Sequence, residues 1–217
     1  MKKASTDLLN GLKDTDAQVR CASVLALSEL KTKDAVSKIA ELLKDTDARV
    51  RSSACEALGR LGVPDPAEQI ARLLKDADTN VRCAAAWTLG DLGACKIASE
   101  ILPLLKDRDG FVRGLSVRVL GRLGAHKLIP SMAQLLKDPN DYVRGSAAEA
   151  LGKLGARQMD SAIGQLLKDP DPFVRSSAVL ALGDLDAKES AREIIKLLKD
   201  EDKRVRDAAT KALDKLR

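Results

Sequence analysis

The stretch that decides the fold is DTNVRCAAAWTLGDLG, residues 78–93, because its pattern recurs along the chain at a fixed interval. The dipeptide Val-Arg recurs every 31 residues, with its arginine at Arg20, Arg51, Arg82, Arg113, Arg144, Arg175 and Arg206. A Lys-Asp pair follows the same period, from Lys13-Asp14 to Lys199-Asp200. Seven units without an insertion account for all 217 residues. Such a period is typical of solenoid proteins.

Each unit has the pattern of two helices. Val50, Ala54, Leu58 and Leu61 are spaced as in an amphipathic helix, and Gly62 supplies the left-handed residue that ends it. A second helix, 67–75, buries Ile70. The sequence therefore predicts an all-α, right-handed α–α solenoid (superhelix) of seven two-helix repeats, forming one domain over 1–217. Helices at about 3–13 and about 203–216 are expected to cap it, because the last one carries a polar face.

Composition excludes several classes of protein. Apolar residues make up 45% and charged residues 32% of the chain, which indicates a folded protein. No apolar run approaches the ~18–20 residues that span a bilayer, and no signal-peptide stretch follows Met1, so we expect a cytoplasmic protein without membrane contact. The cysteines, at Cys21, Cys55, Cys83 and Cys95, form no CxxC motif, and His126 is the single histidine. Free thiols and no metal or other cofactor are expected.

Residues 78–93 resemble the HEAT-like repeats named after phycobilisome lyases, whose signature is Asp-x-x-Val-Arg-x-x-Ala-x-x-Ala-Leu-Gly-x-Leu-Gly. Artificial helical repeat scaffolds related to that family share the 31-residue step. The resemblance implies a HEAT-like solenoid. It implies little about function, because the family includes bilin-lyase subunits, assembly factors and scaffolds.

The recurring arginines have two interpretations, a row of phosphate ligands or a structural ladder. The resemblance favours the ladder, in which each arginine pairs with an aspartate of the Asp14 or Asp16 type and ties neighbouring layers together. A planar guanidinium suits such pairing.

Away from its core positions, the first helix of each unit presents a surface stripe, which the resemblance places on the concave face. All four aromatic residues occupy this stripe. Phe111, Tyr142 and Phe173 hold the same position in successive units, so we expect them to line up, and Trp87 lies on the stripe of the preceding unit. Aromatic side chains are common anchors of interfaces. The predicted partner-binding patch is completed by Leu115, Arg118, Arg122, Glu149 and Leu180.

Gly114 and Gly145 follow Phe111 and Tyr142 by one helical turn. Glycine inside a helix costs about 1 kcal/mol relative to alanine, so these glycines predict a shallow groove beside each ring. The alternative is that the rings cover the turns between units and bind nothing.

The favoured function is a non-catalytic scaffold that binds another protein or a peptide. No carboxylate pair, phosphate loop or nucleophile–base set indicates an enzyme. The resemblance leaves a bilin-lyase-like or phycobilisome-associated assembly factor as an alternative. Nucleic acid is a further, disfavoured partner, because acidic and basic residues alternate on the stripe despite a net charge of +5. Self-association through the ridge stays open.

Overall fold

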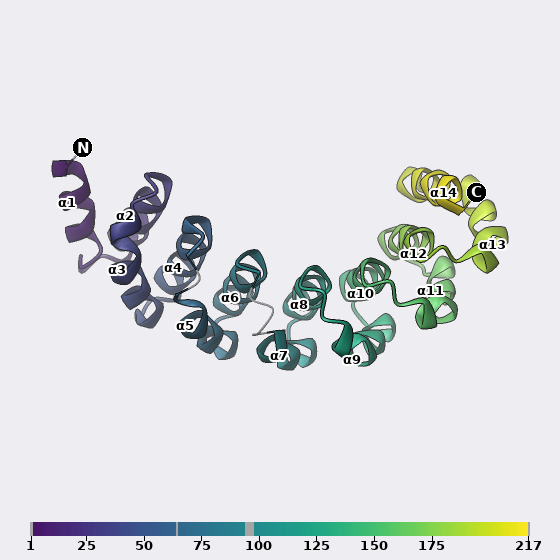
Figure 1. Cartoon of the computed structure of the whole chain (residues 1–217), viewed down its shortest axis with the longest axis horizontal. Helices are drawn as coiled ribbons and strands as arrows, with labels where there is room; N and C mark the ends of the chain where they lie inside the picture. Colours follow the sequence, from purple (N-terminus) through teal and green to yellow (C-terminus); the bar gives the residue numbers. More distant parts are fainter. Residues whose placement is uncertain (1, 64, 94–97, 217) are drawn as a thin grey trace. The chain divides into compact units, whose positions relative to one another are not determined.

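The computed structural model describes residues 2–63, 65–93 and 98–216, and Cys95 lies outside them. All regular elements within these ranges are helical (Figure 1). The chain divides into two compact units, Met1–Ile101 and Leu102–Arg217. The helices of the first unit are α1 (Lys2–Gly11), α2 (Ala17–Glu29), α3 (Val36–Glu41), α4 (Ala48–Leu61), α5 (Ala67–Arg72), α6 (Thr79–Asp91) and α7 (Ala98–Ile101). Those of the second unit are α8 (Gly110–Arg122), α9 (Ile129–Ala133), α10 (Asp141–Lys153), α11 (Asp160–Gln165), α12 (Pro172–Asp184), α13 (Ala191–Lys196) and α14 (Lys203–Leu216).

Each unit consists of a layer of long helices and a layer of short ones (Figure 1). In the first unit, α4 packs against α2 and α6, while the short helices α3 and α5 pack against α4 and α6. In the second unit, α10 packs between α8 and α12, and α12 also packs against α14, with α11 and α13 behind them. The long helices are therefore positioned mainly by one another. None of the described helices is long and apolar enough to cross a membrane.

The ends of the long helices follow local chemistry. The Asp78 carboxylate accepts hydrogen bonds from the N–H groups of Asn80 and Val81, so α6 begins directly after it. The predicted left-handed glycines have φ angles of 61–67°, at Gly62, Gly93, Gly124 and Gly155. Lys31 and Asp186 hold the same place in the 31-residue register and adopt the same conformation, with φ of 51° and 56°. The turn thus keeps its left-handed conformation even where glycine is absent.

A column of apolar side chains fills the space between the two layers of each unit. The column contains Ile39, Ile70 and Ile101 in the first unit and Met132, Ile163 and Ile194 in the second, all fully buried. Leu8 holds the equivalent position in α1 and is only half-buried. The column contains no aromatic residue, so the aromatic rings lie at other positions.

Candidate binding surface

The ladder arginines tie each 31-residue repeat, which we also call a layer of the solenoid, to the next. Arg113 donates from Nε and Nη2 to both carboxylate oxygens of Asp138, at 2.8 and 2.7 Å. Its Nη1 donates to the carbonyls of Asp107 and Arg108, in the turn of its own layer. The same arrangement joins Arg20 to Asp45, Arg51 to Asp76, Arg144 to Asp169 and Arg175 to Asp200. The partner is the aspartate of the Asp14 type, whereas the Asp16 type caps helices.

The ladder carboxylates are ionised more readily than an ordinary aspartate. Partial burial raises the pKa of Asp138, but the hydrogen bonds that it accepts from Arg113 and from the Asn140 N–H outweigh this effect and hold the pKa below its ordinary value of 3.8. The hydrogen bond from Arg175 is the main cause of the lowered pKa of Asp200. The guanidinium groups are thus committed to these carboxylates and are not exposed as phosphate ligands.

Two further ladder arginines also bind the turn of their own repeat. Arg82 is buried and donates to the carbonyls of Asp76 and Ala77 and to the Thr79 hydroxyl. Arg206 donates to the carbonyls of Asp200 and Glu201. Both therefore hold the turn of their own layer, as Arg113 does.

Three aromatic rings, Phe111, Tyr142 and Phe173, form a continuous stack on the long-helix layer of the second unit, and we call this set the aromatic ridge. The ring centroids of Phe111 and Tyr142 lie 5.3 Å apart with an interplanar angle of 14°. Those of Tyr142 and Phe173 lie 6.2 Å apart at 18°. Phe111 is 55% exposed, and the other two rings are half-buried. Because the facing sides cover one another, Tyr142 presents mainly its edge to solvent.

The glycines next to the ridge do not open a groove, and this expectation was wrong. A Cβ atom on Gly114 would lie 2.5 Å from two ring carbons of Tyr142. A Cβ on Gly145 would clash in the same way with Phe173. Each glycine therefore makes room for the ring of the next layer. The sequence contained this signal, since glycine stands at this position only where the next 31-residue repeat contains an aromatic residue.

The other predicted patch residues differ in their exposure and hydrogen bonds. Arg118 donates from Nη1 to the Tyr142 hydroxyl at 3.2 Å, and Glu149 accepts a hydrogen bond from the Ser177 hydroxyl at 3.1 Å. Leu180 is half-buried and Arg122 is exposed. Leu115 is only 6% exposed, so little of its side chain is accessible to a partner.

Trp87 lies on α6, in the first unit, and is 41% exposed. It occupies the surface stripe of its own helix.

The sequence matches the family model of HEAT repeats over residues 5–73, 67–152 and 160–217. The chain belongs to the HEAT-repeat family. Residues 143–169, which include most of α10, also match the PBS lyase HEAT-like repeat. No curated protein matches the sequence.

Solved HEAT-like structures have the same fold. The Escherichia coli protein YibA superimposes with a TM-score of 0.75 at 21% identity, over 100% of this chain and 82% of that one. A chain from the complex of CpcE and CpcF of phycocyanin lyase from Nostoc sp. PCC7120 gives 0.64 at 22% identity, over 98% and 86%. An engineered protein gives 0.58 at 22% identity, over 98% and 96%. At these identities the similarity supports the fold alone.

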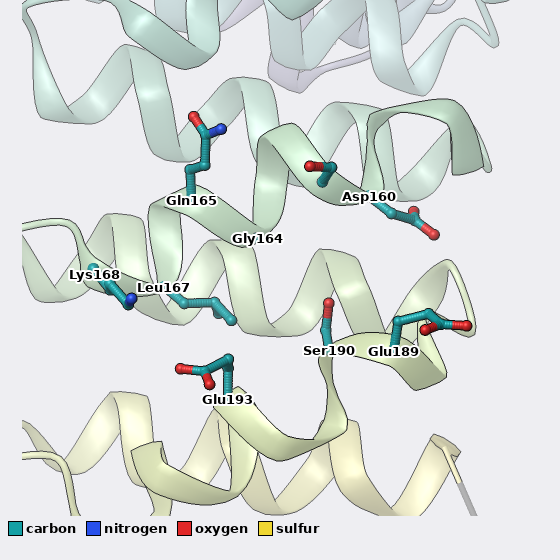
Figure 2. A pocket seen from close by; sticks show the side chains of 9 residues that line it. Asp160, Gly164, Gln165, Leu167, Lys168, Glu189, Ser190 and Glu193 are labelled. Carbon is teal, nitrogen blue, oxygen red and sulfur yellow. The ribbon is translucent and has the colours of Figure 1, made fainter.

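The HEAT repeats of the second unit also contain a hollow of about 580 Å³ in the short-helix layer, which the sequence did not predict. In Figure 2, Asp160 and Gln165 extend from α11, while Glu189 extends from the segment that leads into α13 and Glu193 from α13 itself. Gly164 lines the hollow, and a Cβ atom there would meet only the Ser190 hydroxyl oxygen, at 3.9 Å.

The hollow is acidic, but its groups do not form a metal site. Oδ1 of Asp160 is buried without a hydrogen-bond partner, and burial raises the pKa of this carboxyl. Within 2–63, 65–93 and 98–216, no three His, Cys, Asp or Glu side chains are grouped to hold a metal ion. The aromatic ridge is therefore the stronger candidate for function.

Proposed function

We propose that this HEAT-repeat chain is a non-catalytic scaffold that holds another protein or a peptide against the aromatic ridge. The observation that carries the proposal is the row of three stacked rings on the surface, with Phe111 more than half exposed. Each ring buries a large area with few rotatable bonds, which is why aromatic residues anchor interfaces.

The fixed geometry of the ridge supports this role. Tyr142 is held by two neighbouring rings, by the hydrogen bond from Arg118 and by the close approach of Gly114. A surface that is already ordered loses little conformational entropy when a partner binds. Exposed Arg122 and half-buried Glu149 lie on the same long-helix layer and offer both signs of charge for the rim of an interface.

The test is a selection of peptides from a random display library against the full chain. Peptides bound to the ridge should lose binding to a Phe111→Ala/Tyr142→Ala variant by about tenfold or more, because truncating an anchor removes on the order of 1.4 kcal/mol. A matched control, Ile195→Ala/Leu198→Ala, removes exposed apolar side chains from α13 and from the turn directly after it, and should leave binding unchanged. Selected peptides that bind both variants and the parent chain equally would contradict the proposal.

A second candidate is a bilin-lyase-like or phycobilisome-associated assembly factor. Two observations favour it, the PBS lyase HEAT-like match over residues 143–169 and the similarity to a chain of the CpcE and CpcF complex. Titration with a free bilin separates the candidates. A scaffold leaves the absorbance spectrum of the bilin unchanged, whereas a chain that binds the chromophore shifts it.

We also propose a cytoplasmic location. The proposal is supported by the thiols of Cys21 and Cys55, which form no disulfide with a residue that the structure describes, because a reducing compartment keeps thiols free.

A further inference from the structure

Two outward faces of the chain expose side chains that are core residues in other layers. On the first face, formed by α1 and α2, Val19 is 39% exposed, whereas its equivalents from Val50 to Val205 are fully buried. On the last face, formed by α13 and α14, Leu198 is 39% exposed, whereas equivalents such as Leu43 and Leu167 are at most 4% exposed. Both faces therefore expose apolar side chains whose equivalents in the other repeats are covered by the neighbouring repeat.

Each face also carries one half of the arginine ladder, already in its ladder conformation. Arg206 makes the two backbone hydrogen bonds of a ladder arginine, to Asp200 and Glu201, at 2.6 and 2.9 Å. Its Nε and Nη2 donate to no residue that the structure describes. The Asp14 carboxylate accepts the Asp16 N–H at 2.8 Å, as Asp45 accepts that of Asp47, and no arginine in the described ranges donates to it.

We propose that a second copy of this chain covers these faces, in a head-to-tail contact in which Arg206 of one copy donates to Asp14 of the next. The contact repeats the register of the internal ladder, in which Arg175 pairs with Asp200. It buries Leu198 of one copy and Val19 of the other.

A second charged pair agrees with the same register. Within the chain, Lys215 pairs with Asp184, the residue at the equivalent position of the preceding layer, at 2.5 Å. The residue at that position in the first layer is Glu29. In the head-to-tail contact Lys215 therefore faces a carboxylate, and the charges of the two faces are complementary at both positions.

The outward side of α14 limits the strength of this contact. Lys203 and Asp207 form an ion pair at 2.7 Å there, and Asp214 stands where Gly183 admits Ala212 of the next layer. Two copies consequently cannot approach as closely as α12 and α14 do. The association is reversible and depends on concentration. It extends beyond dimers, because a head-to-tail pair still has one uncovered first face and one uncovered last face to which further copies can bind.

Sedimentation velocity of the purified chain over a concentration series tests the proposal by a charge exchange. Arg206→Asp and Asp14→Arg each place like charges at the contact, so each variant alone should associate about tenfold or more weakly than the parent chain. An equimolar mixture of the two variants restores opposite charges between copies, and association should return. Lys127→Asp makes the same charge change as Arg206→Asp, but on an exposed residue of the second unit away from both faces, and should have no effect on association.

Circular dichroism shows whether each variant is folded, because Arg206 also holds its own turn. Leu198→Glu is a second disruptor that removes no hydrogen bond of the ladder. A parent chain that stays monomeric throughout, charge variants that associate like the parent, or a mixture that stays dissociated would each overturn the proposal. The Phe111→Ala/Tyr142→Ala variant should still associate, which separates this contact from binding at the ridge.

Discussion

In the second unit the long helices approach one another through glycine and alanine, whereas in the first unit Ser28 stands in place of one such glycine and Thr88 in place of one such alanine. A Cβ atom on Gly152 would lie 2.7 Å from the Cα atom of Ala181, so α10 and α12 touch at the backbone. In the first unit a Cβ on Gly59 would meet only the side chain of Thr88, at 3.0 Å. The Thr88 hydroxyl also donates to the Cys55 carbonyl across the layers.

The difference shows that the contact at the position of Gly59 and Gly152 determines how closely a long helix packs against the next one. The ladder does not depend on this position, because its geometry is the same for Arg20 with Asp45 as for Arg113 with Asp138. The stacked rings occur in the second unit, where Gly114 and Gly145 again remove side chains from the contact. The shared turns thus fix the register, and the small residues fix the closeness of packing.

Breaking the shared ladder should have the largest effect, and an equal one in both units. Asp138→Ala and Asp45→Ala each leave a mostly buried guanidinium without its carboxylate, so the free energy of unfolding should fall by about 3 kcal/mol in each variant. Urea denaturation followed by circular dichroism measures this change. Glu41→Ala, at an exposed site, serves as the control. A much smaller loss for Asp45→Ala than for Asp138→Ala would show that the ladder stabilises the first unit less than the second.

Acid should weaken both units through the same carboxylates. The folded-state pKa values of Asp45 and Asp138 lie below the ordinary value of 3.8. Their contribution is therefore complete above that value and is lost as the pH falls through the lower folded-state values. The melting temperature should be constant near neutral pH and should decrease below about pH 4. Arg113→Ala should melt at a lower temperature but lose less on acidification, and an equal loss would contradict this source of the pH dependence.

The glycine contacts should distinguish the units by a smaller amount. Gly152→Ala forces α10 and α12 apart at the backbone and should cost about 2 kcal/mol of stability. Gly59→Ala meets a threonine side chain that can shift, and the better helix propensity of alanine offsets the contact by about 1 kcal/mol, so its net effect should be near zero. Thermal melts of both variants compare the two. Equal losses would show that the interhelical distance does not set the difference.

The smallest expected effect concerns a turn that both units contain. Lys31 and Asp186 adopt a left-handed conformation that costs a side-chain-bearing residue about 1 kcal/mol. Lys31→Gly and Asp186→Gly should therefore each raise the free energy of unfolding by about that amount. Gly155→Ala, at the equivalent position, should lower it, and melting temperatures that move in the same direction for all three would refute the explanation.

The sequence predicted what depends on one helix and its turn. The left-handed conformation of Gly62 and the burial of Ile70 follow from spacing within one repeat. The contact of Gly114 with Tyr142 and the burial of Leu115 were not predicted, because they depend on how one helix is offset against the next. That offset comes from packing between layers, which periodicity along one helix does not contain. Arg113 could be assigned to the ladder, but the sequence did not decide between its two candidate aspartates.

The double engagement of each ladder arginine has a consequence for how the fold opens. Arg144 binds the carbonyls of its own turn and the carboxylate of Asp169, and that carboxylate in turn accepts the Asp171 N–H in the following turn. A layer that opens therefore releases constraints on the turns on both sides of it. Local opening should spread between nearest neighbours, so amide hydrogen exchange at adjacent Asp-x-Asp turns should be correlated.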